Sequence, residues 1–281
     1  MTARELILQL KDLPPVSPTA LKLAGLLNRA TQHNEDIIEV LRYDSALTAR
    51  LLRACNSSWL ALHEPVASVD QAVLLLGHQE IIRFVLALGC GGALRKPLPG
   101  YAVEQGELWR HSLAAALAAE RIAAAAGHFE PAVAFTAGLL HDIGKLVLHQ
   151  ALTPEAQAAI RKRIEEGTDA RVEAEKGVLG TDHAEVGASL LRHWRLPDAI
   201  VEGVAHHHDP AITPTLGLSA VVHVANCLSH LLGEAPGWDA FAIRAQEPVV
   251  EALGLSAEGI EQIVISIHES LQLTDQSLAI A

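Results

Sequence analysis

The sequence predicts an all-α protein, built as a multi-helix bundle with an N-terminal helical subdomain. Hydrophobic residues make up 50% of the 281 residues but aromatic residues only 4%, so the core is aliphatic and rich in the helix formers alanine and leucine. Capping residues repeatedly precede apolar residues at helical spacing, and prolines and glycines separate these runs. We expect a helical subdomain over residues 1–94, a second bundle over 95–233 and a helical extension over 234–281.

The first part of the chain shows a series of helix starts. Each is a serine, asparagine or aspartate whose side chain can accept a hydrogen bond from the first turn. These starts are predicted at Ser17, Asn34, Asp44 and Ser68. Gly77 is expected to end the helix that Ser68 opens, and the next helix, residues 81–88, is expected to end at Gly89.

Charge and the absence of targeting signals limit the function classes. The chain carries 21 Lys and Arg against 33 Asp and Glu, a formal net charge of −12, which argues against a general binder of nucleic acid or of anionic membranes. No apolar run approaches the roughly 20 residues of a membrane span, and the N-terminus lacks the apolar core of a signal peptide. Cys55, Cys90 and Cys227 lie far apart and are interpreted as reduced core residues. We therefore expect a soluble, cytoplasmic protein.

The second part opens with a proline- and glycine-containing connector, residues 95–100, and an alanine-rich helix over about 104–126 that carries His111. The sequence leaves open whether His111 binds a ligand or packs in a helix face. Pro131 starts the next helix, which leads to His141 and Asp142. Neighbouring helical residues point about 100° apart, so these two side chains can meet only at a helix edge or end.

The two residues that follow support such a break. Gly144 can supply the irregularity, and Lys145 adds a cation suited to phosphate. The charged segment over 151–177 is interpreted as a solvated helix face because its charges are mixed in sign.

Further histidines follow in the next helices. Asp182 and Glu185 have capping-box spacing, which places His183 in the first turn of a helix. Another helix starts at Asp198 and ends in three consecutive histidines, residues 206–208, of which two could reach one site; a surface run of histidines is the alternative.

The last helix of this part, roughly residues 215–232, places His223 and Asn226 three residues apart and thus on one face. His230 and His268 are expected at the surface, and the tail from Trp238 is expected to form two or three helices.

Seven of these residues are candidate ligands of a metal ion held inside a helical bundle. They are His111, His141, Asp142, His183, His207, His208 and Asn226. Imidazoles with a carboxylate suit a divalent transition metal such as iron, manganese or zinc, as one ion or two, and do not favour calcium or magnesium. A metal with open positions can activate water and neutralise phosphate oxygens; in an enzyme of that kind, Asp142 and Lys145 would be the catalytic residues.

Several motifs in the first part resemble the N-terminal part of the HDOD domain, an HD-related output domain of bacterial signalling proteins. The motifs are LPP at 13–15, DSALT at 44–48, LLRACNS at 51–57, VDQAV at 69–73 and LG at 76–77. The second part also resembles the wider HD phosphohydrolase superfamily. This resemblance assigns His111, His141 and Asp142 to the histidine and His-Asp positions of that superfamily. His183, His207 and His208 correspond to the extra histidines of the HD-GYP type of cyclic-dinucleotide phosphodiesterase.

Two departures separate the chain from those enzymes. Asn226 stands where the closing aspartate is expected, and residues 209–214 lack a Gly-Tyr-Pro signature and are short for a substrate loop. HDOD domains are generally non-catalytic output modules. The resemblance therefore implies an HD-type bundle that acts in signal transduction, keeps a metal site and is non-catalytic. It also implies a signalling protein partner that binds in trans, and a nucleotide or phosphate as a small ligand. The alternative is a metal-dependent phosphohydrolase or phosphodiesterase.

Overall fold

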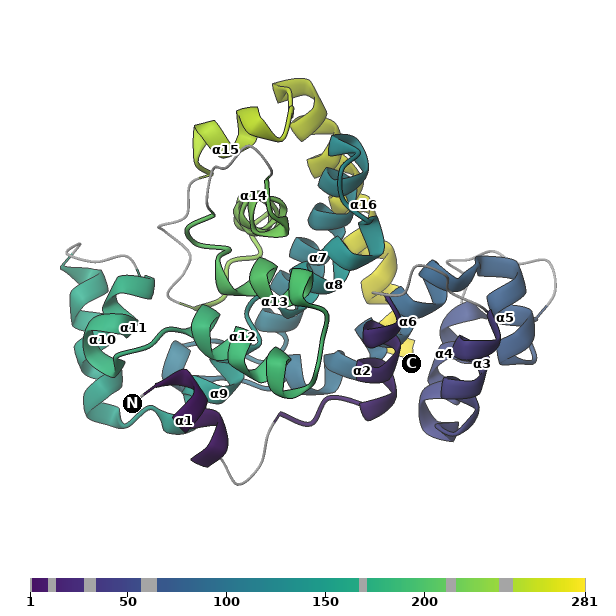
Figure 1. The fold of residues 1–281 in the computed structure, drawn as a ribbon, viewed down its shortest axis with the longest axis horizontal. Coiled ribbons are helices and arrows are strands. Elements are labelled where there is room, and N and C mark those ends of the chain that lie inside the picture. The colour runs from purple at the N-terminus through teal and green to yellow at the C-terminus, as the bar shows by residue number, and fades with distance from the viewer. Residues whose placement is uncertain are drawn as a thin grey trace.

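A computed structural model of the chain describes residues 2–9, 14–27, 34–56, 65–166, 171–210, 216–237 and 245–280, with side chains described up to residue 272. All regular elements within these ranges are helices, apart from one isolated antiparallel bridge between Leu98 and Val103. The all-α prediction is therefore confirmed, and Figure 1 shows the helices gathered around a central group.

Sixteen α-helices and one 3-10 helix follow one another along the described parts of the chain. They are α1 (Ala3–Gln9), α2 (Pro18–Leu26), α3 (Asn34–Arg42), α4 (Ser45–Cys55), α5 (Val69–Leu76), α6 (His78–Leu94), the 3-10 helix η1 (Pro99–Tyr101), α7 (Glu107–Ala126), α8 (Pro131–Leu140), α9 (Gly144–Ala151), α10 (Pro154–Glu165), α11 (Arg171–Leu179), α12 (His183–His193), α13 (Asp198–Ala205), α14 (Leu218–Leu231), α15 (Glu247–Ala252) and α16 (Ala257–Ile280).

Helices α2 to α5 pack around α6. Three of the predicted caps are confirmed: Ser17, Asp44 and Ser68 accept hydrogen bonds from the backbone N–H groups of Ala20, Leu47 and Gln71, respectively. Gly77 ends α5 with a φ of 79°, a conformation that glycine adopts without strain.

Helix α6 corrects one prediction. It continues through Gly89, where the sequence was expected to end it, as far as Leu94. A Cβ atom at Gly89 would lie only 2.4 Å from the Cβ of Ala20 on α2, so the glycine allows two helices to approach closely. Gly89 therefore marks tight packing and not a helix end.

The central layer consists of α7, α8 and α14, which pack against one another. The face of α7 is lined largely by alanine and leucine, and its close contact with α8 requires Gly138, because a Cβ atom there would lie 2.7 Å from the carbonyl oxygen of Ala115. Helix α7 begins at Glu107, three residues later than expected, since the bridge between Leu98 and Val103 and the left-handed Gly106 precede it.

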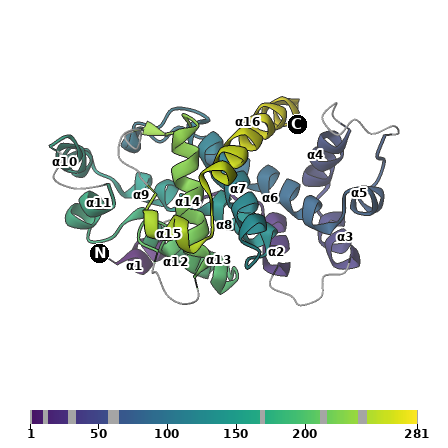
Figure 2. The ribbon, with the colours of Figure 1, turned by 90° about the horizontal axis from the view of Figure 1, so that it is seen from above.

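Helix α13 packs onto this layer against α8 and α14, and α12 packs against both α13 and α9. Helix α1 lies against α12, and α16 runs along α7 to reach α4 (Figures 1 and 2).

By length and composition, one helical stretch of the described chain, Pro131–Ala151, could cross a membrane. A second candidate arises only if α5 and α6, which are bent by 120° relative to each other, are counted as a single span. The first stretch spans α8 and α9, and 89% of its apolar window is buried against the rest of the protein, which is the setting of a core helix.

Candidate metal centre

His141 and Asp142 lie in the break between α8 and α9, where residues 141–143 form a turn. The carbonyl groups of Leu140 and Asp142 accept hydrogen bonds from backbone N–H groups three residues later, as in a tight turn. The two side chains consequently share a direction, with Nε2 of His141 3.5 Å from Oδ2 of Asp142. The sequence predicts this placement at a helix end, and the structure confirms it.

Gly144, the first residue of α9, brings this turn against the start of α12. A Cβ atom at Gly144 would lie 1.9 Å from the carbonyl oxygen of His183 and 2.6 Å from the backbone nitrogen of Gly187. No other residue type fits this contact without movement of the backbone. The close approach places the Asp142 carboxylate 3.4 Å from Nε2 of His183.

Three ligand atoms form a first cluster, referred to below as the Asp142 cluster: Nε2 of His111, Nε2 of His141 and Oδ2 of Asp142. The two nitrogens are 3.1 Å apart, and they lie 3.4 and 3.5 Å from the carboxylate oxygen. Ligand atoms about 2.1 Å from a metal ion are separated by about 3.0 Å in octahedral and about 3.4 Å in tetrahedral geometry. The triangle thus has the dimensions of one face of a metal coordination sphere.

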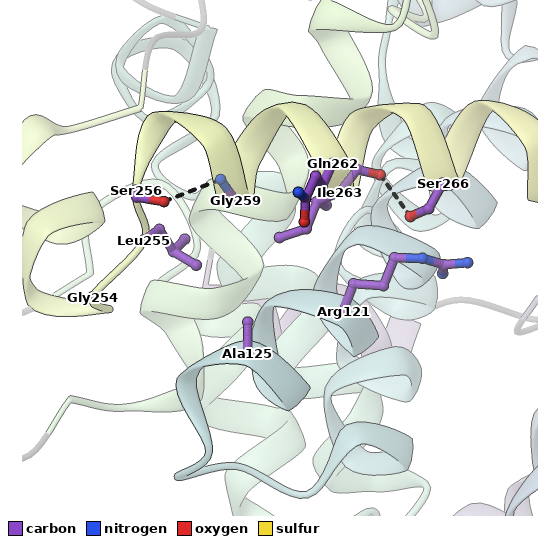
Figure 3. Close-up of a pocket in the computed structure, with 9 residues that line it drawn as sticks. All are labelled: Arg121, Ala125, Gly254, Leu255, Ser256, Gly259, Gln262, Ile263 and Ser266. Atoms are coloured by element: carbon purple, nitrogen blue, oxygen red, sulfur yellow. Dashed lines mark hydrogen bonds between the residues drawn. The ribbon is translucent and has the colours of Figure 1, made fainter.

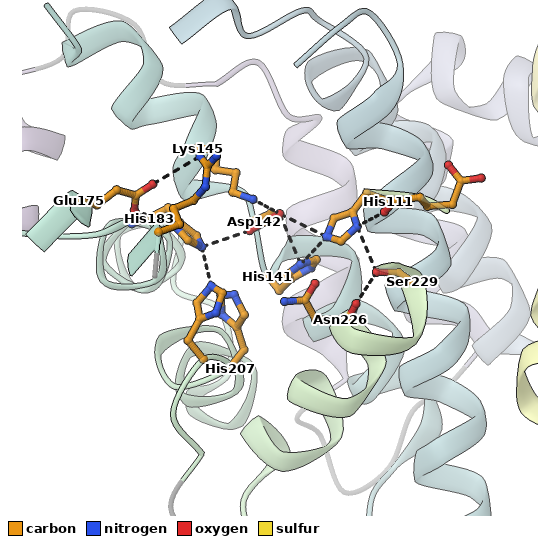
Figure 4. Close-up of polar contacts among 12 residues, drawn as sticks. His111, His141, Asp142, Lys145, Glu175, His183, His207, Asn226 and Ser229 are labelled. Carbon is orange, nitrogen blue, oxygen red and sulfur yellow. Dashed lines mark hydrogen bonds and ion pairs between the residues drawn. The ribbon is translucent and has the colours of Figure 1, made fainter. Parts of the chain in front are cut away.

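Three histidines form a second cluster, the His183 cluster, made of His183, His207 and His208. Their ligand atoms lie within 4.8 Å of one another, and the Nε2 atoms of His183 and His208 are 2.8 Å apart. Asp142 joins the two clusters, because its Oδ1 faces His183 while its Oδ2 faces His111 and His141 (Figure 4).

In four of the histidines, Nδ1, the ring nitrogen that does not face the cluster, lies within hydrogen-bonding distance of an oxygen that carries no hydrogen. The Nδ1 atoms of His111, His141, His183 and His207 lie 2.7, 2.8, 2.7 and 2.7 Å from Glu234 O, Gly138 O, Glu175 Oε2 and Val204 O, respectively. In a neutral ring the proton therefore resides on Nδ1 and the lone pair on Nε2.

The consequence is a convergence of lone pairs. Nε2 of His111 and Nε2 of His141 face each other at 3.1 Å with no proton to share, and the Asp142 oxygen beside them is also an acceptor. Nε2 of His207 is buried and has no hydrogen-bond partner among the described residues. Buried hydrogen-bond acceptors that face one another destabilise the fold unless a cation lies between them. These imidazole nitrogens and the carboxylate therefore fit a bound metal ion as its ligands.

Electrostatics favours the protonation states that metals bind. Burial by itself raises the pKa of the Asp142 carboxyl group, but the Lys145 ammonium group and the neighbouring histidines outweigh burial and hold that pKa well below its usual value. Burial lowers the pKa of His141 to about 4, and it places the pKa values of His207 and His208 well below their usual value. Near neutral pH these residues therefore offer an ionised carboxylate and neutral imidazoles.

His183 differs from these three rings. Burial by itself lowers the pKa of His183, but the charge and the hydrogen bond of Glu175 outweigh burial and raise that pKa above its usual value. A metal ion at this ring therefore competes with a proton.

Lys145 lies inside this site. Its Nζ atom is 2.6 Å from Oδ2 of Asp142, and both side chains are buried. The two residues that the sequence singles out for catalysis are thus in direct contact, and the ammonium group balances the carboxylate charge.

Helix α14 supplies the remaining predicted residue. Asn226 is buried on the side of α14 that faces His141 (Figure 4), and its Oδ1 has no hydrogen-bond partner among the described residues. His223, on the same helix, contacts no ligand atom of either cluster directly; its Nδ1 donates to the carbonyl oxygen of His207 and so holds the histidine turn in place. Whether Asn226 coordinates an ion stays a prediction.

Some contacts of the site were not foreseen. His230, expected at the surface, is half-buried with its ring centroid 4.9 Å from that of His111, and the Ser229 hydroxyl lies 3.1 Å from Nδ1 of His111. Glu175 and Arg171 lie in the segment interpreted as a solvated face, yet both are buried. A glutamate buried on a helix with few apolar residues leaves no periodic signal, so only the tertiary contact identifies it.

A separate cavity of about 490 Å³ lies between the second half of α7 and the start of α16 (Figure 3). Arg121, Gln262 and Ile263 are among its lining residues, and none of the candidate ligands borders it. The metal centre is instead enclosed: His208 is the only histidine of the two clusters that is not fully buried.

Comparison with known proteins relates the chain to one family. A family model described as the HDOD domain matches residues 13–210. A crystal structure of an HDOD domain protein of unknown function from Geobacter sulfurreducens is 25% identical, with a TM-score of 0.72 over 99% of this chain and 95% of that one.

Two curated relatives are also similar. An uncharacterized protein of Treponema pallidum (strain Nichols) is 25% identical over 241 residues, 81% of this chain, and a ribonuclease Y of Thermus thermophilus is 31% identical over 152 residues, 54% of this chain. The matches cover 44% of the Treponema protein and 21% of the ribonuclease, so this chain corresponds to less than half of either relative.

Proposed function

The chain belongs to the HDOD domain family, and we propose that it is an output or interaction module of signal transduction that holds a transition metal in a buried centre without turning over a substrate. The observation that carries the proposal is the convergence of the Nε2 atoms of His111, His141 and His183 on the two carboxylate oxygens of Asp142 in an enclosed site.

The Asp142 cluster would hold one ion, with His111, His141 and Oδ2 of Asp142 as its protein ligands. The His183 cluster would hold a second ion with help from Oδ1 of Asp142. Iron, manganese and zinc all suit this mixture of imidazole and carboxylate. A bound ion supplies Lewis acidity and positive charge; the protein orients the ligands through the Nδ1 hydrogen bonds and keeps water away through burial.

Two features support binding without turnover. Asn226 brings no negative charge to the position where a carboxylate could bridge two ions, and the described residues leave only His208 partly accessible from solvent. Residues of α7, the α8–α9 turn, α12 and the turn after α13 would hold a buried ion of this kind. Its presence or absence can therefore change the surface that a partner contacts.

The proposed partner is a signalling protein that binds in trans, and a phosphate or nucleotide is the small ligand that the metal and Lys145 would suit. The net charge of −12 argues against nucleic acid and anionic membranes as partners. A cytoplasmic location is also proposed, because Cys55, Cys90 and Cys227 are free and buried.

The second candidate function is a metal-dependent phosphohydrolase or phosphodiesterase. It is favoured by the contact between Lys145 and Asp142 at the metal site and by the similarity to ribonuclease Y over 54% of this chain. In that case Asp142 would help to hold the metal, which would supply an activated water, and Lys145 would contact a phosphate oxygen.

One experiment separates the two functions. The protein is purified aerobically and anaerobically, its metal content is measured by mass spectrometry, and hydrolysis of a model phosphodiester, cyclic dinucleotides and nucleotides is assayed. Asp142→Ala is the test variant. Asp209→Ala, an exposed aspartate close to the histidine turn, is the matched control.

We expect the wild type and Asp209→Ala to contain metal, Asp142→Ala to contain little, and none of the three to hydrolyse any substrate. Turnover that depends on Asp142 would establish the enzyme instead. A wild type that binds no metal under either condition would refute both functions at this site.

A further inference from the structure

Glu175 makes two hydrogen bonds to one candidate ligand. A single oxygen, Oε2, accepts from the backbone N–H of His183 at 2.9 Å and from Nδ1 of the His183 ring at 2.7 Å. Both side chains are fully buried, so no water competes for these contacts. The carboxylate thus fixes both the backbone and the ring of His183 through hydrogen bonds.

We propose that Glu175 is a positioning residue of the metal centre, which fixes the tautomer and orientation of His183 and thereby sets the affinity of the second ion. The inference deepens the proposed function and rests on it for the identity of the ligand. Glu175 itself points at the far side of the imidazole, away from the converging ligand atoms (Figure 4).

The chemical reason is the proton on Nδ1. A carboxylate accepts the Nδ1 proton more strongly than the carbonyl groups that anchor His111, His141 and His207, so it holds the lone pair on Nε2 and increases its donor strength. His183 is the only one of these four rings that has a carboxylate in that position. It is also the ring that lies against both Asp142 and His208.

Glu175 is itself held by its surroundings. Its second oxygen, Oε1, lies 4.0 Å from Nη1 of Arg171, one turn earlier on α11. The Arg171 guanidinium group in turn lies over the ring of Tyr101, 5.0 Å from its centroid. Arg171 therefore offsets the negative charge of Glu175, and the stack on η1 limits the movement of α11 relative to the metal centre.

This arrangement predicts a selective effect. Glu175 contacts His183 but neither His111 nor His141, so its loss should weaken the His183 cluster and leave the Asp142 cluster intact. Loss of such an outer hydrogen-bond partner typically reduces metal affinity about 10–100-fold.

The test uses the full chain and compares Glu175→Gln with Glu173→Gln, an exposed glutamate two residues earlier on the same helix. The first measurement is the tautomer of His183 in metal-free protein, read from the nitrogen chemical shifts of ¹⁵N-labelled imidazoles in mildly alkaline buffer. We expect the Nδ1–H form in the wild type and in Glu173→Gln, and a shift toward the Nε2–H form in Glu175→Gln, whose amide can donate to Nδ1.

The second measurement is titration with Zn²⁺ alone. We expect the wild type and Glu173→Gln to bind two ions, and Glu175→Gln to bind the first with unchanged affinity and the second about 10–100-fold more weakly. Glu175→Asp keeps the charge but its side chain is too short to reach both N–H groups of His183. Its affinity for the second ion should therefore lie between those of the wild type and Glu175→Gln. Glu175→Asp also serves as the test variant if Glu175→Gln does not fold.

The outcomes separate this inference from the function on which it rests. If the wild type binds no Zn²⁺, the proposed metal site is refuted, while the tautomer measurement still decides whether Glu175 orients His183. An unchanged tautomer, or equal weakening of both ions, would overturn the positioning role, since a purely structural residue lowers stability without selecting one ring.

Discussion

The ligand atoms of His141 and Asp142 point to one position because α8 ends at Leu140 and both residues lie in the turn that follows it. Four of the five candidate histidines, all except His208, are then fixed by a second contact on the Nδ1 atom, so their Nε2 atoms face inward in the absence of any ion. Pre-oriented lone pairs reduce the entropy lost when a metal binds. At the residue scale, the site depends on the outer contacts as much as on the ligands themselves.

The first prediction concerns Asn226, whose buried Oδ1 makes no hydrogen bond within the described part of the chain. Asn226→Asp adds a negative charge beside the cluster, so metal affinity should rise by about an order of magnitude. Without metal the added charge is buried and unpaired, and the melting temperature of the variant should fall. Isothermal titration with Zn²⁺ and thermal unfolding with and without metal measure the two effects.

Asn226→Leu is the matched control for this prediction, because it keeps a similar volume and removes the oxygen. Its metal affinity should be lower than that of the wild type. If neither substitution changes the affinity, Asn226 does not coordinate the ion.

At the scale of the elements, glycines decide which helices can meet. Gly89 lets α2 approach α6, Gly138 lets α8 approach α7, and Gly144 lets α9 approach α12. Of these, the contact at Gly144 is the tightest and lies directly beside the ligands. The same residue type ends a helix at Gly77, so a glycine in the sequence does not by itself distinguish a helix end from a close contact.

The second prediction tests the contact at Gly144. Gly144→Ala places a methyl group 1.9 Å from a backbone oxygen of α12, which only a shift of one helix can relieve. The variant should lose about 1–3 kcal/mol of unfolding free energy, measured in urea, and should lose the His183 cluster as a metal site because Asp142 and His183 move apart.

Gly92→Ala is the control for that prediction. Gly92 lies within α6, and a Cβ atom there meets nothing within 4 Å. The substitution should be neutral or stabilise the protein by up to about 1 kcal/mol, with unchanged metal content. A Gly144→Ala variant as stable as Gly92→Ala would show that α9 and α12 do not need this close contact.

At the scale of the whole molecule, the candidate centre brings together residues from helices that are far apart in the sequence. His111 on α7 and His208 after α13 are far apart in sequence. His111 contacts His141 and His208 contacts His183, and both of these partners lie beside Asp142. An ion bound there would connect the central layer to the helices packed on it. The division into three parts at residues 94 and 233 stays a prediction.

The third prediction follows from this connection. An ion that binds only the folded protein, present at about 100 times its dissociation constant, stabilises the fold by about 2.7 kcal/mol, which raises the melting temperature of a protein of this size by about 5 °C. Differential scanning fluorimetry of chelated and Zn²⁺-loaded protein measures the shift.

Two neighbouring histidines provide the comparison for this shift. His207→Ala removes a fully buried candidate ligand and should lose a large part of the shift, whereas His206→Ala, at an exposed position next to it, should retain it. Equal shifts in both variants would exclude His207 from the site.

The amino-acid sequence by itself determined the all-α fold, the helix starts at Ser17, Asp44 and Ser68, and the set of histidines worth testing, because capping and helical spacing are local properties of the chain. The break at His141 and Asp142 was also predictable, since two adjacent helical residues cannot otherwise share a direction.

Only the tertiary structure decided that these residues meet, that Asp142 faces both clusters, and that Glu175, Ser229 and His230 surround them. The reason is physical: these contacts join residues from different helices, and they depend on helix separations set by Gly138 and Gly144, for which the local sequence carries no pattern.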